Sequence, residues 1–303
     1  MEREQQFTYH WYAAREAFYN EQYASALVQL LFCEQLNPQD ALTKEYLAVF
    51  YDAMGQKEKA MSYLRAAYEL DPVRRWRAYS AMLYRSEQPE QRKELLKVAQ
   101  HVVKLDAKNE DAWDNLLRAA MVNEKYRLAL SVQDKIDGLR GYDGMSALSR
   151  YRIYAMMGKG KKALQEIDKY LLIDPNNVQF WLLKMQGLEV MQAPFAECEA
   201  AYQQVLRLDP NNLTALNNYA YLLATHGGDL RQAESFSRRT IQEQPNNPVF
   251  LDTYAWILHL QGQEVLATYY IKKALEHIPA DENAVIWEHY KMIVKETENP
   301  LFK

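Results

Sequence analysis

The sequence has few of the residues that break helices or crosslink chains. Its 303 residues include ten glycines, ten prolines and two cysteines, and two cysteines exclude a dense disulfide framework. No apolar run approaches the roughly 18 to 20 residues that span a bilayer, so no membrane insertion is expected. A net charge of −4 gives no general attraction to nucleic acid, and we expect no nucleic-acid partner.

The sequence also lacks the common patterns of catalytic and metal sites. Its six histidines are scattered, and neither an HExxH nor a CxxC motif occurs. Residues 158–162, GKGKK, look like a phosphate-binding loop, but they lack the upstream glycine and the Ser or Thr after Gly-Lys. We expect a solvated turn there. The chain is therefore predicted to have no enzymatic activity, no metal site and no cofactor.

The first residues show no sign of a secretion signal. Residues 1–18 contain no apolar segment of the kind that a signal peptide requires. This favours the cytoplasm, but a periplasmic or secreted protein whose leader has been removed would show the same sequence. The compartment therefore stays open.

Six of the ten prolines recur at a fixed interval. They are Pro38, Pro72, Pro175, Pro210, Pro245 and Pro279. Neighbouring members lie 34 or 35 residues apart, or a multiple of that interval, and the two remaining positions carry Ala107 and Gly141. A period of this length along the chain predicts a stack of similar units, not one globular domain around a pocket.

A column of mostly small residues lies twelve residues before the prolines. It consists of Ala26, Ala60, Leu95, Ala129, Ala163, Cys198, Ala233 and Ala267. A similar column, which begins with Ala14 and Ala48, lies another twelve residues earlier. Small residues on two amphipathic stretches let paired helices approach closely. Because Cys33 and Cys198 align with alanines of other units, we interpret both as packing residues.

Each unit therefore has the pattern of two helices joined by a turn. Gly55, Gly158, Gly228 and Gly262 are predicted to form the turn between the two helices. A proline then ends the second helix. The Asn or Asp that follows it, as in DPNN (174–177), is predicted to cap the next helix.

In this arrangement the sequence resembles the tetratricopeptide repeat (TPR) family. The best copy is 248–281, with Tyr254, Ala255, Gly262 and Ala267 at family positions. The resemblance implies an all-α fold, an α-α superhelical solenoid of helix-turn-helix repeats with a C-terminal capping helix. The implied domains are a solenoid over 1–281, with units at about 7–40, 41–74, 75–109, 110–143, 144–177, 178–212, 213–247 and 248–281, and a capping helix and tail over 282–303.

The third, fourth and sixth units depart from the family pattern, which leaves their helix register open. Unit three has Leu95 where alanine is usual, and unit four has Gly141 where proline is usual. Any functional irregularity is expected in this middle region, between Ala107 and Gly141. The last helical pattern, with Trp287 and Tyr290, is interpreted as a cap on the stack. The alternative is a homodimer contact through these two residues.

In the TPR family the first helix of each unit lines a concave groove, and the resemblance implies partner-binding residues there. The predicted groove residues are Asn115, Arg118, Arg152, Asn217, Tyr221, Asp252, Trp256 and His259. The guanidinium groups of Arg118 and Arg152 would hold a carboxylate or phosphate, and Asn115 would add a hydrogen bond. The alternatives are pairing of the arginines with Asp114 or another acid, and packing of Trp256 between repeats.

The predicted function is that of a non-enzymatic scaffold or adaptor that binds a protein or peptide segment in its groove. The alternative is a structural subunit that acts by self-association or by assembly into a larger complex. A Lys/Asn clamp for chaperone C-termini is present only in fragments, such as Asn115 with Arg118, which disfavours that partner. A small molecule or a polysaccharide is also disfavoured, because most aromatic residues fall at interior helical spacing.

Overall fold

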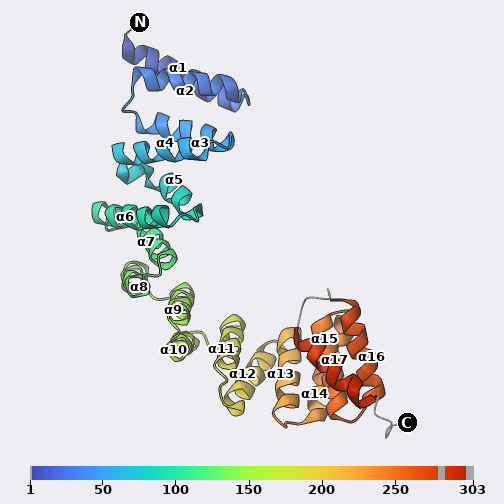
Figure 1. Ribbon diagram of the computed structural model, residues 1–303. Coiled ribbons are helices and arrows are strands. Elements are labelled where there is room, and N and C mark those ends of the chain that lie inside the picture. The colour runs from blue at the N-terminus through green and yellow to red at the C-terminus, as the bar shows by residue number, and fades with distance from the viewer. Residues whose placement is uncertain (1, 279–283, 298–303) are drawn as a thin grey trace. The chain divides into compact units, whose positions relative to one another are not determined.

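The structure, a computed structural model, describes residues 2–278 and 284–297, and every regular element in these ranges is an α-helix. The predicted all-α solenoid of helix pairs is confirmed. The chain forms two compact units, Met1–Gly158 and Lys159–Lys303. The division falls between the two helices of the predicted repeat 144–177. Figure 1 shows the helices of each unit in chain order.

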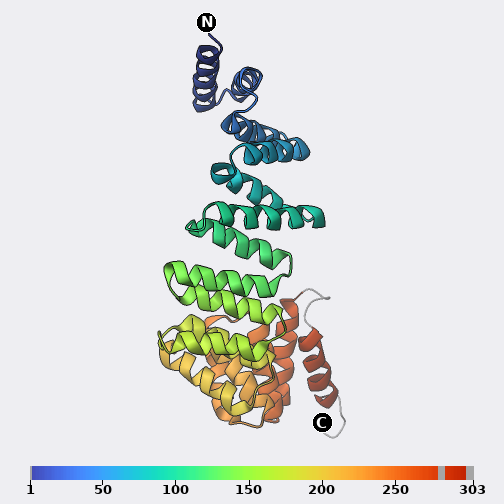
Figure 2. The same ribbon diagram turned by 90° about the vertical axis from the view of Figure 1, so that its left-hand side faces the viewer.

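The first unit consists of four helix pairs and one further helix. Its helices are α1 (Arg3–Tyr19), α2 (Tyr23–Leu36), α3 (Ala41–Ala53), α4 (Lys57–Leu70), α5 (Pro72–Arg85), α6 (Pro89–Leu105), α7 (Glu110–Val122), α8 (Tyr126–Arg140) and α9 (Gly144–Met156). Each of these helices packs against the next one in the sequence, and Figure 2 shows the resulting layers. One apolar cluster extends through this unit from Ala14 to Ile136.

The second unit contains eight described helices. They are α10 (Gly160–Leu171), α11 (Val178–Val190), α12 (Phe195–Leu208), α13 (Leu213–Thr225), α14 (Leu230–Glu243), α15 (Pro248–Leu260), α16 (Glu264–Glu276) and α17 (Ala284–Thr297). The last of them, α17, packs against both α15 and α16 and buries Ile286 and Ile293 there. It is the capping helix that the sequence predicts. The predicted tail over 298–303 and Pro279 lie outside the described residues.

Most turns inside the pairs place one residue in the left-handed region of backbone space. Glycine fills this position in four turns, at Gly55, Gly158, Gly227 and Gly262, with φ between 68° and 76°. Lacking a Cβ, glycine adopts this conformation at little cost. Gly228, which the sequence predicts in the turn of its repeat, lies in that turn between α13 and α14, but Gly227 holds the left-handed position. Gly228 donates its N–H to the carbonyl of Leu223 at 2.8 Å, which closes the end of α13.

The first helix of most pairs begins at a capping side chain. The capping residues are Asp40, Asp71, Asn109, Asp143, Asn177, Asn212 and Asn247. In α13, for example, Asn212 Oδ1 accepts a hydrogen bond from the N–H of Ala215 at 3.0 Å. Such a bond satisfies one of the backbone donors that a helix start leaves unpaired. The predicted capping role is confirmed for Asp40, Asn177, Asn212 and Asn247, which follow a proline, whereas Asp71 caps α5 from the position before Pro72.

The irregular pair is the third, α5 and α6. In a regular repeat the first helix begins three residues after the proline position, as at Ala41 after Pro38, whereas Pro72 is itself the first residue of α5. Proline is accepted there because the first residue of a helix needs no N–H donor. The register that the sequence leaves open in this region is regular at Ala107 and Gly141, since α7 and α9 both begin three residues after these positions.

The small-residue column is buried throughout. All eight members, from Ala26 to Ala267, are at most 3% exposed. Cys33 and Cys198 are both buried as free thiols, as predicted. Burial raises the pKa of the Cys33 thiol to about 11, so this side chain is protonated and unreactive at neutral pH.

A polar cluster joins α8 to α9 at the junction that lacks a proline. Asp137 on α8 accepts hydrogen bonds from Ser146 Oγ at 2.7 Å and from Arg150 Nη2 at 2.6 Å. The side chains of Asp137 and Arg150 are each only 13% exposed. Burial raises the pKa of Asp137, but the hydrogen bonds from Ser146, Arg150 and Gln133 outweigh it and hold that pKa below its ordinary value. Charged hydrogen bonds therefore hold this junction together.

The substitution Asp137→Asn should lower the free energy of unfolding at pH 7 by about 3 kcal/mol, because it removes the buried charged partner of Arg150 and leaves only the exposed Asp134. Since the pKa of Asp137 is lower in the folded state, its contribution is present above the unfolded value of about 3.9 and is lost as the pH falls below it. The difference from wild type should therefore shrink in urea denaturation below about pH 4. Asp134→Asn is the control, because Asp134 also binds Arg150 but is 66% exposed; an equal loss in both variants would contradict the role of burial.

Candidate functional site

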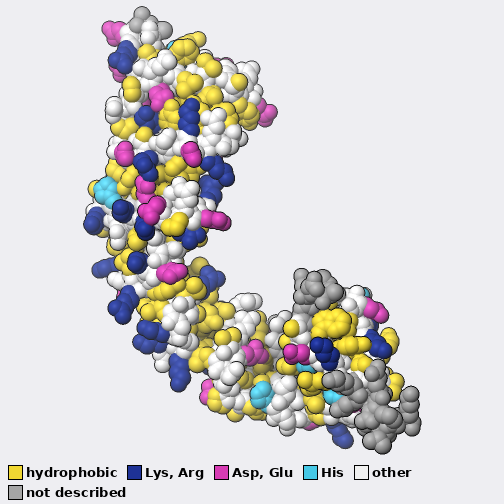
Figure 3. Space-filling model, viewed as in Figure 1, with side chains coloured by type: hydrophobic (Ala, Val, Ile, Leu, Met, Phe, Trp, Pro, Cys, Tyr) yellow, Lys and Arg dark blue, Asp and Glu magenta, His cyan; other side chains and the backbone are white. Residues whose placement is uncertain are grey.

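The first helices of successive pairs present a row of side chains that we call the first-helix column. It consists of Arg15, Val49, Tyr84, Arg118, Arg152, Gln186, Tyr221 and Trp256. The five members in the first unit are all exposed, and they include Val49 at 54% and Tyr84 at 49%. Figure 3 shows hydrophobic side chains interspersed with charges of both signs over the visible face of this unit. Exposed apolar side chains beside arginines are typical of surfaces that another protein covers.

The two predicted arginines of the first unit are available to a ligand. Arg118 on α7 and Arg152 on α9 are exposed, and neither forms an ion pair with any residue that the structure describes. Asp114, the acid considered as an alternative partner, lies 3.2 Å from Arg140 instead. No measured contact joins Arg118 to Arg152, so their shared binding of one anion stays a prediction.

The two predicted asparagines are buried instead of exposed. Asn115 donates a hydrogen bond to Ser80 Oγ at 3.2 Å, so it is occupied within the first unit and does not assist Arg118. Asn217 is 3% exposed and donates to Asn218 Oδ1 at 3.3 Å. The carbonyl oxygen of Asn217 has no hydrogen-bond partner among the described residues.

In the second unit, α17 covers the end of the first-helix column. The ring of His289 on α17 stacks on that of Trp256, with centroids 4.3 Å apart and 17° between the planes. The same histidine lies 6.0 Å from the ring of Tyr221. Gln186 in α11 remains exposed. Trp256 is thus a packing residue, and its partner is the capping helix.

The predicted residues Asp252 and His259 also have partners inside the second unit. Nδ1 of His289 lies 2.9 Å from Asp252 Oδ1, and both side chains are 8% exposed. Nδ1 of His259 lies 2.9 Å from the carboxylate of Glu264, at the start of α16. Asp252 therefore joins α15 to the capping helix, and His259 joins the two helices of the last pair.

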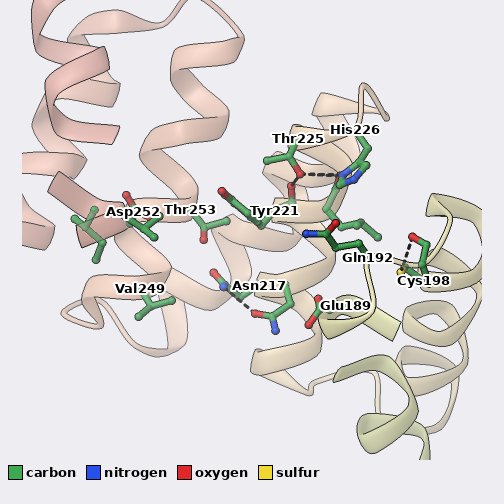
Figure 4. Close-up of a pocket in the computed structure, with 15 residues that line it drawn as sticks. Glu189, Gln192, Cys198, Asn217, Tyr221, Thr225, His226, Val249, Asp252 and Thr253 are labelled. Atoms are coloured by element: carbon green, nitrogen blue, oxygen red, sulfur yellow. Dashed lines mark hydrogen bonds between the residues drawn. The ribbon is translucent and has the colours of Figure 1, made fainter. Parts of the chain in front are cut away.

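A pocket of about 750 Å³ opens beside these residues in the second unit. Its polar wall includes Glu189 from α11, Asn217 and Tyr221 from α13, and Asp252 from α15, so it brings together three of the predicted site residues. Figure 4 shows these side chains entering the pocket from the three helices. The apolar part of the wall comes from Ala193, Leu222, Val249, Val285 and Ile286.

The pocket is rich in hydrogen-bond acceptors and negative charge. The described residues that line it include the carboxylates of Glu189 and Asp252 but no Lys or Arg. Glu189 accepts a hydrogen bond from the hydroxyl of Tyr202. Burial raises the pKa of Glu189, and burial together with the nearby Glu189 raises the pKa of the Cys198 thiol. No Lys or Arg among the described lining residues lies beside this carboxylate in the pocket.

The sequence reasoning missed two residues of this region, His289 and Glu189. A signal existed for His289, because it lies three residues after Ile286 and four before Ile293, on the apolar face of α17. The register places Glu189 on the groove face, three residues after Gln186 in α11, but only its surroundings distinguish it from the other acids at such positions.

The described residues contain no group of three or more His, Cys, Asp or Glu side chains that could hold a metal ion. None of the described helices is both long enough and apolar enough to cross a membrane.

Comparison with known proteins agrees with the helix pairs and their period. The family profile described as tetratricopeptide repeat matches residues 47–74, which cover most of α3 and all of α4. The profile match identifies one tetratricopeptide repeat in the chain, at residues 47–74. No curated protein sequence matches this chain.

Solved structures share the fold at low sequence identity. The C-terminal part of a TPR repeat-containing protein from Cytophaga hutchinsonii is 16% identical, covers 82% of this chain and 98% of its own, and has a TM-score of 0.59. A tetratricopeptide repeat protein from Parabacteroides merdae is 18% identical, covers 84% of this chain and 99% of its own, and has a TM-score of 0.47. YrrB, described as a TPR protein with an unusual peptide-binding site, is 15% identical, covers 73% of this chain and 95% of its own, and has a TM-score of 0.39.

The substitution His289→Ala should loosen the capping helix. It leaves the buried Asp252 without its partner and removes the stack on Trp256, at a cost of about 1 to 3 kcal/mol. We expect faster proteolysis within α17 and a change in tryptophan fluorescence. His277→Ala is the matched control, because His277 is exposed and has no partner among the described residues. Equal proteolysis of the two variants would show that His289 does not hold α17.

Proposed function

We propose that this TPR protein is a scaffold that binds an extended segment of a partner protein along its first helices. Proteins with the TPR fold generally bind other proteins. Here the first helices are proposed as the binding surface and an extended segment as the ligand. The supporting observation is the first-helix column of the first unit, where apolar and cationic side chains are exposed together.

The composition of this column suits a protein ligand. Val49 and Tyr84 offer apolar area that a partner would remove from water. The guanidinium groups of Arg118 and Arg152 offer several donors each, without an internal acid to compete for them in the described part of the chain. Apolar anchors flanked by arginine are common in the energetically important parts of interfaces.

A capture experiment tests this function. The purified chain serves as bait in extract from its native cells, and the captured proteins are quantified against a variant with Arg118→Glu and Arg152→Glu. A partner that uses the first helices should be depleted about tenfold or more, because each substitution replaces a charged donor with a repelling carboxylate. Arg127→Glu on α8, a second helix, is the control, since Arg127 is equally exposed.

If capture by the double variant equals that by wild type, or if Arg127→Glu removes the same proteins, the first helices of this unit do not form the binding surface.

Self-association is the second candidate, and one observation favours it. The first helix, α1, exposes Tyr9 at 62%, Tyr12 at 61% and Tyr19 at 78%. Their spacing of three and seven residues places these rings along one side of the helix, and exposed aromatic rings in a row are common at contacts between protein chains. The contact predicted from the sequence, through Trp287 and Tyr290, involves two half-buried rings that pack on each other with centroids 5.7 Å apart.

Sedimentation velocity over a range of concentrations distinguishes these contacts. If α1 mediates a dimer, the double substitution of Tyr12 and Tyr19 by Glu should yield a monomer, whereas Trp287→Ala should leave the dimer intact. The reverse pattern would favour the C-terminal contact. A wild-type monomer at high concentration would exclude self-association by either route.

A further inference from the structure

The pocket of the second unit has properties that specify what it would hold. Its lining combines two carboxylates with an apolar wall and lacks Lys and Arg among the described residues. A neutral or negatively charged guest would leave the Glu189 carboxylate desolvated and uncompensated, which is costly. A cationic guest would remove that cost.

Asn217 indicates a second property of the guest, a hydrogen-bond donor. Its side chain is 3% exposed, it lines the pocket, and its carbonyl oxygen has no hydrogen-bond partner in the part of the chain that the structure describes. Its amide nitrogen is already used by Asn218. A buried acceptor without a donor costs free energy, and a donor on a ligand would recover it. The side chain therefore needs a donor, not another acceptor.

The apolar wall indicates a third property of the guest, a hydrocarbon part. Leu222, Val249 and Val285 line the pocket together with its polar groups, and Val249 and Val285 are about half exposed, at 45% and 49%. Such a wall suits a side chain with a hydrocarbon stem and a charged end, because the stem buries apolar area while the end reaches the acceptors. Lysine and arginine are the residues with this form.

We propose that this pocket holds the Lys or Arg side chain of a bound protein segment, with Glu189 and Asn217 accepting its hydrogen bonds. The inference rests on the proposed function, because it assigns a specificity to the same kind of ligand. A volume of about 750 Å³ exceeds the needs of one side chain and leaves room for the neighbouring backbone. Asp252 contributes negative charge at the pocket but keeps its bond to His289.

The test is selection of binding segments from a random twelve-residue library displayed between flanking sequences, so that no free terminus is present. Binders of the full chain are then made as synthetic peptides, and their dissociation constants are measured by calorimetry. We expect an invariant Lys or Arg in those peptides that the variant with Arg118→Glu and Arg152→Glu binds as tightly as wild type. Replacing it by norleucine, which keeps the stem and removes the charge, should weaken binding at least tenfold.

Variants of the protein locate the site. Glu189→Gln should weaken the basic peptides about tenfold and Asn217→Leu about fivefold, because each removes an acceptor. Asn217→Asp keeps an acceptor oxygen and adds charge, so it should preserve or strengthen binding. Glu197→Gln is the control, since Glu197 is an exposed acid outside the pocket. Circular dichroism of each variant confirms that the helices are intact.

The results separate the two proposals. Peptides that bind the double variant of Arg118 and Arg152 without a basic residue, or basic peptides whose affinity is unchanged by both Glu189→Gln and Asn217→Leu, would overturn the inference and leave the scaffold function standing. If no peptide binds through this pocket, the inference fails, whereas the scaffold function of the first unit is decided by the capture experiment with Arg118→Glu and Arg152→Glu.

Discussion

The close approach of paired helices is the constraint on which the rest of this structure depends. Every member of the small-residue column is buried, and a larger side chain there would push the two helices of a pair apart. The small-residue column lies on the second helix of each pair. The exposed positions of the first helix therefore contribute little to the stability of the pair. Those positions can therefore vary in chemistry from repeat to repeat, as the change from Val49 to Tyr84 to Arg118 illustrates.

Much of the fold could be predicted because the information is repeated. Eight copies of one pattern fix the period, the small-residue column and the capping residues, and errors in one copy are corrected by the others. Single-copy features were less predictable. Pro72 fits both a turn and the first residue of a helix, so the sequence does not distinguish them. The left-handed residues Glu21, Glu124 and Gln192 have no local preference for that conformation, and the packing of the pair imposes it.

In the candidate site, too, the residues set by the repeat were predictable and the single-copy features were not. Tyr221, Asp252 and Asn217 were found because the repeat places them on the first helices. Their surroundings were not found, because His289 belongs to a helix outside the repeat and Glu189 resembles many other acids. Arg118 and Arg152 show the opposite case: their exposure follows from the register alone, and the structure adds only that no described acid pairs with them.

The seat of α17 has a consequence for how this array could have grown. Its buried Ile286 and Ile293 occupy the surface of the last pair on which a further repeat would stack. A duplication appended after residue 278 would have to displace this helix and break the pair between Asp252 and His289. Duplications inserted between existing repeats meet no such barrier, because each regular repeat offers the same surfaces at both ends. The surface of the last pair is thus covered by α17, and additional repeats are accommodated more easily between existing repeats than after the last one.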